Sequence, residues 1–566
     1  MEFPIGVSDF EEMIQSNYHF IDKSLLIKEI MEDGGKAILL TRPRRFGKTL
    51  NLSMLYYFLS KSYHDKANKN LFEGLNISKE KEFCKKHQGQ YPVIFISFKD
   101  IKELNFDAAY KKIIVLISAL YGQHRYLLEG DLLAQDEKII FEALLNQKAE
   151  KANVEAAIQV LAKYLRKKFN RLPIILIDEY DTPIQQAYLK KHYDEMIIFM
   201  RGFLGQALKD NIPEERFLEK AIVTGITRIG QESIFSGLNN FEVYSVLKEK
   251  YGQYFGFTEE EVLKLMNNSH QTVPLASIKE WYNGYQVGKY VLYNPWSIIK
   301  CFKENGALKW YWVNTASNDL IAQLLWDAKS TVKKQFEELL QGNNIEQAIF
   351  ENLVFADIKK REGALWSLLL YAGYLKVLST ERRGNRLVAI LAIPNREVSY
   401  VYDDIIEQWF DEAIDLDSYD DFKQSLINGD VEKFKKYISD YMIQTGSYFD
   451  FNSKTNEQIF HVFILGLIVG LRDYYSIHSN QEGGFGRCDV MFMPKDKRNN
   501  GILLEFKISK VPNDLMNKAQ EALEQIKDRK YIEQFRQAGV SSVLVVGLAF
   551  CGKQLELVSE NIVIEN

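Results

Sequence analysis

A basic loop near the N-terminus has residue types that bind phosphate. An apolar run at 37–40 leads into the loop 42–46, and Gly47, Lys48 and Thr49 then open a segment with helical apolar spacing. In this order of strand, loop and helix, backbone N–H groups surround phosphate oxygens and the lysine reaches the β and γ oxygens. The threonine hydroxyl is then placed to bind Mg²⁺. The segment therefore predicts an ATP site.

This loop departs at one position from the pattern G-x-x-x-x-G-K-[ST], because Arg42 stands where the first glycine belongs. Arg42, Arg44 and Arg45 are candidates for contacts with phosphates or with a partner. Arg45 and Leu50 complete the cofactor-binding residues that we predict in this segment. The competing interpretation is a basic loop that caps a helix.

A pair of acidic residues, Asp178 and Glu179, ends a later apolar run. An aspartate at the end of a strand can hold Mg²⁺ through water, and a glutamate directly after it can orient and polarise an attacking water. We predict Asp178, Thr224 and Arg228 as cofactor-binding residues, with Arg228 as a sensor of the γ-phosphate. Asp178 shares the metal with Thr49, and Glu179 is catalytic. An acidic strand terminus of the kind found on many α/β sheets is the competing interpretation.

Asp489, Glu505 and Lys507 form a second constellation near the C-terminus. Glu505 and Lys507 are two residues apart in the apolar run 502–508, so on a strand both side chains project from one face. Two charges there are costly without partners, and Asp489 in the preceding strand-like run, 487–493, is a natural partner. Asp and Glu oxygens suit Mg²⁺ or Mn²⁺, and the lysine can position or deprotonate a water for attack on a phosphodiester. The competing interpretation is a solvated salt-bridge face.

The elements that must position these residues follow from the apolar patterns. Strands are predicted at 37–40, 92–98, 172–178 and 220–226, and helical patterns, notably 154–169 and 195–208, lie between them. This alternation predicts a mostly parallel sheet covered on both faces. Ligands on such a sheet bind outside the carboxyl ends of the strands, where the predicted ATP-site residues fall.

The pattern changes after about residue 245. The region 245–445 is mainly helical, apart from a hairpin predicted around Arg383, Gly384 and Asn385, and its aromatic clusters are assigned to packing. The polar stretch 446–456 predicts a linker. A C-terminal unit follows, with a helix over 459–471 and with strands predicted at 474–479, 487–493, 502–508 and 542–548.

Composition limits the classes of function. The 566 residues are too many for one ordinary domain, and 46% apolar with 26% charged residues is a globular composition. A net charge of −5 argues against a surface coated for DNA binding, so any nucleic-acid contact must be local. Basic clusters at 166–168, 382–386 and 495–498 are candidate phosphate contacts, and only the last is expected beside the second constellation.

No signal peptide or membrane-spanning run is visible, and the four cysteines are too far apart in sequence to suggest a metal site. We therefore expect a cytoplasmic protein without membrane contact.

The chain resembles, over nearly its full length, the bacterial AAA-ATPase-like proteins with a C-terminal PD-(D/E)XK nuclease domain. RPRRFGKTLNLSML resembles that family's phosphate loop, including its lack of the first glycine, and LIDEYDTPI and TGITRI resemble its next motifs. FIDKSLLIKEI resembles its entry motif, and WYNGYQVG, YNPWSII and YAGYLKV resemble its middle region. GRCDVMF and LLEFKIS match the nuclease motif at Asp489, Glu505 and Lys507. The resemblance also implies Glu457 as a metal ligand on the first core helix, and Gln525 and Tyr531 as residues that follow the nuclease core.

The resemblance implies an α/β protein with three parts: an AAA-like P-loop ATPase domain with a parallel sheet over 1–244, a mainly helical middle or lid region over 245–445, and a restriction-endonuclease-like α/β domain over 446–566. We predict an ATP-binding, Mg²⁺- or Mn²⁺-dependent nuclease that cuts DNA, with ATP binding or hydrolysis regulating the nuclease. The alternative is an ATP-dependent switch or nucleic-acid-binding protein that does not cleave. The sequence leaves open DNA against RNA, ATP hydrolysis against binding alone, a homo-oligomeric state and the pathway.

Overall fold

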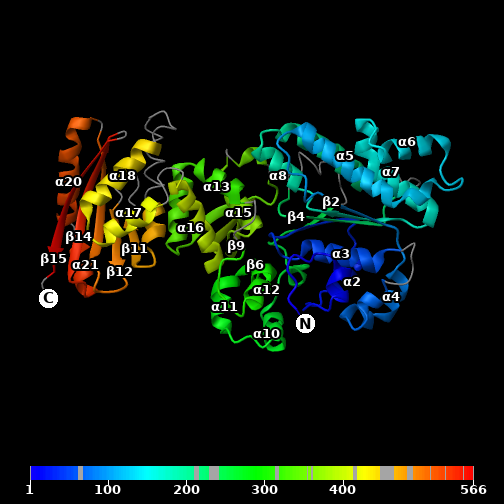
Figure 1. Ribbon diagram of the computed structural model, residues 1–566, viewed down its shortest axis with the longest axis horizontal. Coiled ribbons are helices and arrows are strands. Elements are labelled where there is room, and N and C mark those ends of the chain that lie inside the picture. The colour runs from blue at the N-terminus through cyan, green and yellow to red at the C-terminus, as the bar shows by residue number, and fades with distance from the viewer. Residues whose placement is uncertain are drawn as a thin grey trace. The chain divides into compact units, whose positions relative to one another are not determined.

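The computed structural model describes residues 2–61, 68–209, 216–228, 241–312, 318–353, 355–358, 361–411, 417–445, 465–480, 489–509, 511–528, 531–551 and 554–564 (Figure 1). The chain divides into two compact units, the first made of Met1–Leu320 with Glu346–Val398 and the second of Ile321–Ile345 with Ser399–Asn566. The boundaries predicted at 244/245 and 445/446 stay predictions.

The first unit contains a five-stranded sheet in the order β2-β3-β4-β1-β5. Its strands are β1 (Ala37–Thr41), β2 (Val93–Ser97), β3 (Ile174–Asp178), β4 (Lys220–Gly225) and β5 (Phe241–Tyr244). All of its neighbours pair in parallel, which confirms the predicted parallel sheet. β5 was not predicted. In the sheet, β4 lies between the strand that leads into the basic loop and the strand that ends in Asp178.

Helices cover both faces of this sheet, as predicted. Figure 1 shows α5 and α7 on one side of the strands and α2 and α3 on the other. Every residue of β1, β3 and β4 is buried, which accounts for their continuous apolar sequences. The helices are α1 (Phe10–Gln15), α2 (Leu25–Glu32), α3 (Lys48–Leu59), α4 (Lys81–His87), α5 (Phe106–Gln123), α6 (Gln135–Leu145), α7 (Lys151–Phe169), α8 (Thr182–Leu189) and α9 (Tyr193–Leu208).

The rest of the first unit is mixed rather than purely helical. It holds α10 (Glu259–Asn268), α11 (Leu275–Tyr282), β6 (Tyr285–Val287), β7 (Tyr290–Leu292), α12 (Pro295–Lys303), β8 (Ile345–Ile349), α15 (Glu362–Ala372), β9 (Lys376–Arg383) and β10 (Arg386–Ala392). The predicted hairpin is confirmed as β9 and β10, which belong to a sheet of order β8-β10-β9. The small hairpin β6–β7 was not predicted.

The second unit contains a mixed sheet in the order β11-β12-β13-β14-β15. β13 (Gly501–Ile508) is central; it runs antiparallel to β12 (Asp489–Pro494) and parallel to β14 (Ser542–Cys551). β11 (Tyr475–Asn480) and β15 (Gln554–Val563) are the edges. Its helices include α14 (Ser330–Leu340), α17 (Asp417–Ile427), α18 (Val431–Thr445), α20 (Leu515–Asp528) and α21 (Tyr531–Gln537); α13 (Asn318–Trp326) and α16 (Arg396–Asp411) span the boundary between the units.

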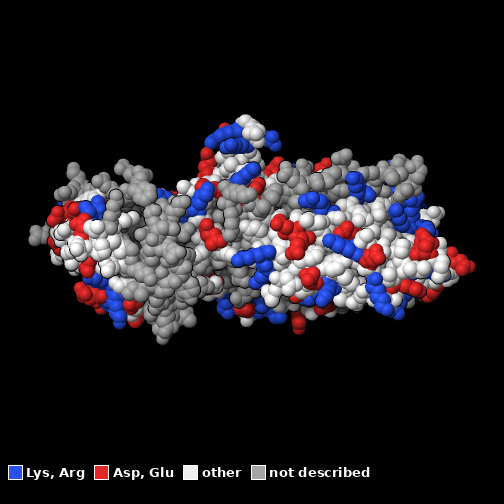
Figure 2. Space-filling view, turned by 90° about the horizontal axis from the view of Figure 1, so that it is seen from above, with Lys and Arg blue, Asp and Glu red and all other residues white. Residues whose placement is uncertain are grey.

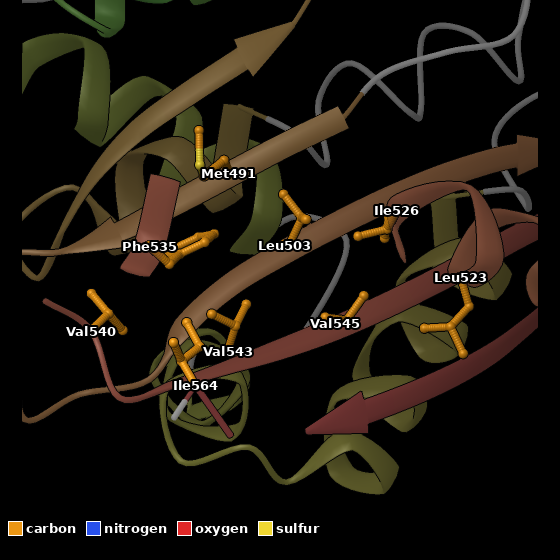
Figure 3. Close-up of a cluster of buried hydrophobic side chains, with 9 residues drawn as sticks. All are labelled: Met491, Leu503, Leu523, Ile526, Phe535, Val540, Val543, Val545 and Ile564. Atoms are coloured by element: carbon orange, nitrogen blue, oxygen red, sulfur yellow. The ribbon is translucent and has the colours of Figure 1, made fainter. Parts of the chain in front are cut away.

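Helix α20 packs directly on this sheet. Leu523 and Ile526 of α20 join Leu503, Val543 and Val545 of the strands in one buried cluster (Figure 3). Gly547 of β14 permits the close approach, because a Cβ atom there would lie 2.3 Å from the Ala519 carbonyl oxygen. The odd-numbered residues of β13 therefore face α20.

The surface carries both signs of charge. On the face shown in Figure 2, Lys and Arg are interspersed with Asp and Glu among the coloured residues. Within the described ranges, no helix combines the length and the apolar composition needed to cross a bilayer.

Candidate nucleotide and nuclease sites

The basic loop joins β1 to α3 and turns through two left-handed residues. Arg45 has φ of 65° and Gly47, which precedes the first residue of α3, has φ of 77°. Glycine adopts this conformation without strain, and a Cβ at Gly47 would meet no atom within 4 Å. The loop thus presents the N-terminus of α3 beside open space, as a phosphate site requires.

Lys48 lies inside this loop. Its Nζ donates to the carbonyl oxygens of Arg42 at 3.0 Å and Pro43 at 2.8 Å, and the residue is buried. Burial lowers its pKa, while the nearby carboxylates of Glu179 and Asp178 act in the opposite direction. A bound phosphate would offer this ammonium group a charged acceptor in place of two neutral carbonyls.

Asp178 gathers hydroxyl groups from three neighbouring elements. The Thr49 Oγ1 donates to Asp178 Oδ2 at 2.7 Å and the Thr224 Oγ1 donates to Asp178 Oδ1 at 2.6 Å. The Ser97 hydroxyl lies 3.5 Å from Oδ2. Burial raises the pKa of Asp178, and the Thr224 and Thr49 hydrogen bonds oppose that shift. The structure therefore brings Thr49, Asp178 and Thr224 together. Ser97, which ends β2 and lies within the strand predicted at 92–98, was missed.

The two acidic residues after Asp178, Glu179 and Asp181, make different contacts. Glu179 has φ of 50° and accepts a hydrogen bond from the Thr182 hydroxyl at 3.1 Å. Asp181 is buried and its Oδ2 accepts from the backbone N–H groups of Ile226 at 2.9 Å and Thr227 at 3.0 Å. Asp181 therefore fixes the segment after β4 beside the end of β3, a positioning function that the sequence did not suggest.

A cavity of about 540 Å³ opens at the loop. Seven residues that the sequence predicted as site residues or phosphate contacts line it: Arg44, Arg45, Gly47, Lys48, Thr49, Leu50 and Glu179. Its other walls come from the N-terminal segment, including Val7, Phe20 and Ile21, and from the first turn of α12 at Trp296 and Ile299. The cavity is large enough for a nucleotide-sized ligand, with cationic and apolar walls.

Trp296 is a cavity residue that sequence analysis missed. The Arg45 guanidinium lies over its indole, 4.3 Å from the ring centroid. The wall that contains it is held by other contacts, since Lys23 forms a 2.6 Å ion pair with Glu261 of α10 and Asn51 of α3 donates to the Tyr254 carbonyl at 3.0 Å. The region after residue 245 thus contributes directly to the cavity.

Arg42 does not contact the cavity. It is fully buried, and its Nη1 donates to the carbonyl oxygens of Thr41 at 2.8 Å and Tyr244 at 2.7 Å. Burial lowers its pKa to about 9. The interpretation of Arg42 as a phosphate or partner contact is therefore wrong, because its guanidinium joins the start of the loop to the end of β5.

Arg228 does not line the cavity either. Its Nε is buried without a hydrogen-bond partner among the described residues, and burial lowers its pKa. Its function as a γ-phosphate sensor stays a prediction.

Glu505 and Lys507 project from the α20-facing side of β13. Glu505 is 0% exposed, and among the described residues neither of its carboxylate oxygens has a hydrogen-bond partner. The Lys507 Nζ donates to Gln525 Oε1 of α20. A buried carboxylate without partners is costly, so the Glu505 oxygens fit a divalent cation as their missing partner.

The remaining predicted metal ligands are not described at the side-chain level. Asp489 is the first residue of β12, but its side chain lies outside the described residues, as do all of Glu457 and the side chain of Tyr531. Among the side chains that are described, no three His, Cys, Asp or Glu gather closely enough to hold a metal.

The basic cluster at 495–498 lies at the wrong end of the sheet. It forms the turn between β12 and β13, whereas Asp489 begins β12 and Lys507 lies near the end of β13. At about 3.4 Å per residue, Glu505 is roughly 17 Å along the strand from this turn. The expectation that this cluster lies beside the cutting site is therefore wrong.

Comparison with known families assigns both parts of the chain. Residues 4–235 match the family described as "Predicted AAA-ATPase", and residues 455–560 match the PD-(D/E)XK nuclease superfamily. The chain therefore contains an AAA-ATPase-like domain over residues 4–235 and a PD-(D/E)XK nuclease superfamily domain over residues 455–560.

A relative over nearly the whole length is an uncharacterized protein in the vnfD 5′ region of Azotobacter chroococcum mcd 1. It is 24% identical over 581 residues, which cover 97% of this chain and 96% of the relative. Among solved structures, a Walker-type ATPase of Pyrococcus abyssi aligns over 67% of this chain and 94% of its own, with 14% identity and a TM-score of 0.31.

Proposed function

We propose that this protein is an ATP-binding, Mg²⁺- or Mn²⁺-dependent nuclease that cleaves phosphodiester bonds in DNA, and that its nucleotide state regulates cleavage. The observation that carries the nuclease proposal is Glu505, on the strand that also carries Lys507. Its carboxylate is fully buried, and its two oxygens have no hydrogen-bond partner in the part of the chain that the structure describes. Burial of an unpaired carboxylate is energetically unfavourable, and a bound cation would remove that cost.

The strand register supports Asp489 as the second ligand. β12 and β13 pair with Val490 opposite Leu504 and Met491 opposite Leu503. The same register carried one residue further sets Asp489 opposite Glu505, and directly opposed residues of an antiparallel pair belong to one face of the sheet. By resemblance, Glu457 is the third ligand.

Lys507 is the residue that acts on water in this proposal. Its Nζ is held by the Gln525 side chain, which fixes the ammonium group on the α20-facing side of β13 beside Glu505. From there it can position or deprotonate the water that attacks phosphorus. A bound divalent ion polarises a phosphoryl oxygen and lowers the pKa of a bound water.

In the first unit, the N–H groups from Arg45 to Leu50 and the Lys48 ammonium bind the phosphates of ATP. Thr49 and Asp178 hold Mg²⁺, and the Thr224 hydroxyl orients the Asp178 carboxylate through its 2.6 Å hydrogen bond. Glu179, which lines the cavity, polarises the attacking water. Arg45, which also lines the cavity, is a further phosphate contact.

A cleavage assay tests the nuclease proposal. Plasmid is incubated with the full chain in Mg²⁺ or Mn²⁺, with and without ATP, beside Glu505→Ala and Lys507→Ala variants. Loss of cleavage in both variants, with cleavage retained by a Lys495→Ala control in the distant β12–β13 turn, is the expected result. Cleavage that survives in both variants would remove this site from the mechanism.

One observation favours a second candidate, a nucleotide-dependent switch that binds nucleic acid without cutting. Glu505 is 0% exposed. A phosphodiester must reach the metal that Glu505 holds in order to be cut, and full burial of the carboxylate opposes that approach. If the wild-type chain binds nucleic acid but does not cut it in any divalent metal, this second candidate replaces the nuclease.

A further inference from the structure

The β9–β10 hairpin has an exposed tip. All residues from 378 to 386 are exposed, and because side chains alternate along a strand, both faces of the ribbon are solvated there. β9 is the edge strand of its sheet. At the turn, a Cβ on Gly384 would meet no atom within 4 Å. Among the described residues, nothing covers this two-stranded tip.

Three arginines surround the turn. Arg383 pairs directly across the ladder with Arg386, and Arg382 is next to Arg383 on β9. Like charges opposite each other destabilise a hairpin, so folding stability does not account for this arrangement. A function for the positive charge is the alternative.

Acidic side chains compensate only one of these arginines. The Arg383 guanidinium forms ion pairs with Glu346 at 2.6 Å and with Glu381 at 2.9 Å. Arg382 and Arg386 are exposed and have no hydrogen-bond or ion-pair partner among the described residues. Two guanidinium groups therefore remain available on one tip.

In two other basic clusters, protein groups engage some of the basic side chains. Lys167 pairs with Glu137, and the Arg166 guanidinium donates to the Arg216 carbonyl. Arg498 is held by both oxygens of Asp496. For a chain of net charge −5, whose charges are interspersed on the face in Figure 2, the hairpin tip offers a local basic contact.

We propose that the β9–β10 tip binds duplex nucleic acid, with Arg382 and Arg386 contacting backbone phosphates. The major groove of B-form DNA is about 12 Å wide and admits β-strands, so the exposed β9–β10 turn can enter it. The planar guanidinium fork matches phosphate oxygens in a bidentate way. This inference rests on the nucleic-acid partner in the proposed function, but it requires neither metal nor cleavage.

Binding of a labelled duplex to the full chain in EDTA tests the inference, because cleavage is then blocked. Arg382→Ala/Arg386→Ala is compared with wild type over a salt series. Loss of two phosphate contacts lowers the slope of log K against log salt by about 2 and weakens binding about tenfold at physiological salt. Arg382→Lys/Arg386→Lys, which keeps the charge, retains most of the affinity.

The matched control is Lys111→Ala/Lys148→Ala, which removes two exposed positive charges from the same unit. Its binding should stay within about twofold of wild type. An equal loss in both double variants would mean that overall charge controls binding, and would overturn the inference. Unchanged ATP affinity and circular dichroism in the hairpin variant show that it folds.

The outcomes separate this inference from the proposed function. If wild type cleaves DNA but the hairpin variant binds the duplex as wild type does, only the hairpin assignment fails. If wild type binds no duplex, both fail together. If the hairpin variant loses binding to polyglutamate but keeps the duplex, the tip binds an acidic protein instead. If the duplex binds through the hairpin but is not cleaved in any metal, the proposal that the tip binds duplex is supported and the proposed nuclease activity is rejected.

Discussion

The hydroxyl of Thr49, in the first turn of α3, donates a 2.7 Å hydrogen bond to the carboxylate of Asp178 at the end of β3. The two residues are 129 positions apart in the chain. The parallel sheet brings them to the same edge, because β1, β3 and β4 all end there. A metal held by both residues would therefore link the phosphate loop to the acidic strand.

Replacement of Thr49 by Val tests this link. The isosteric change removes the hydroxyl, so we expect the Mg²⁺-dependent part of the ATP affinity to fall about tenfold, the usual size for one hydrogen bond to a charged group. Thr49→Ser keeps the hydroxyl and should behave as wild type. ATP titrations with and without Mg²⁺ measure the effect. Equal Mg²⁺ dependence in wild type and Thr49→Val would contradict it.

Arg42 and Arg44 are two positions apart in sequence, but we expect replacement of Arg42 to affect folding stability and replacement of Arg44 to affect ATP binding. Arg42→Met leaves the buried carbonyls of Thr41 and Tyr244 without their donor, and should lower the free energy of unfolding by about 2–3 kcal/mol. ATP affinity of the folded protein should change little. Urea denaturation and ATP titration on the same preparations separate the two properties.

Arg44→Met provides the comparison. Arg44 lines the cavity and donates to the Gln185 side chain at a long 3.3 Å, so its loss should change stability by less than about 0.5 kcal/mol and weaken ATP binding. A stability loss in Arg44→Met equal to that in Arg42→Met would refute the assignment of different functions to these two arginines.

The sequence alone was sufficient to predict those parts of the fold and of the candidate sites that depend on residues close together in the chain. Strand, loop and helix around Lys48, and the alternation of Glu505 and Lys507 on one strand, are local patterns, and the predicted sheets in both units are confirmed. The edge strands β5 and β15 were missed because their short or half-exposed sequences lack a continuous apolar run.

Residues that depend on tertiary contacts could not be found in this way. Trp296 reaches the phosphate loop from a helix about 250 positions later in the chain, and no local pattern distinguishes it from a packing aromatic. The burial of Arg42 depends on Tyr244, which lies 202 positions away. The distance of the 495–498 turn from Glu505 required the direction of both strands, which spacing along the chain does not supply.

Gly547→Ala should destabilise the second unit. The added Cβ would lie 2.3 Å from the Ala519 carbonyl oxygen and 2.6 Å from the Leu523 backbone nitrogen, so α20 must move away from β14. Overpacking of this kind costs about 1–3 kcal/mol. Hydrogen exchange should show lost protection in α20 and β14. Gly205→Ala in α9, where a Cβ meets no atom within 4 Å, is the neutral or stabilising control.

The pH dependence of stability should report Glu397. This carboxylate is buried, and its Oε1 accepts from the Ser297 hydroxyl at 2.8 Å and from the N–H groups of Tyr311 at 2.8 Å and Trp312 at 3.0 Å. Burial raises its pKa from 4.5 to about 7, and these hydrogen bonds oppose the shift. The folded state therefore retains a proton that the unfolded state releases between these two values.

It follows that this carboxylate stabilises the fold fully below pH 4.5 and loses its contribution as pH rises to about 7. The loss is on the order of 2–3 kcal/mol. Denaturation between pH 5 and pH 8, compared with Glu397→Gln, isolates the effect: the variant is less stable at pH 5 but its stability changes less with pH, because it cannot titrate. Parallel pH profiles would show that Glu397 has an ordinary pKa.

Glu397 can also affect the nucleotide cavity, because its partner Ser297 follows Trp296 in α12. If the Glu397→Gln variant weakens the contact between Arg45 and Trp296, the indole fluorescence should change, and this change would connect the Glu397 carboxylate to the cavity.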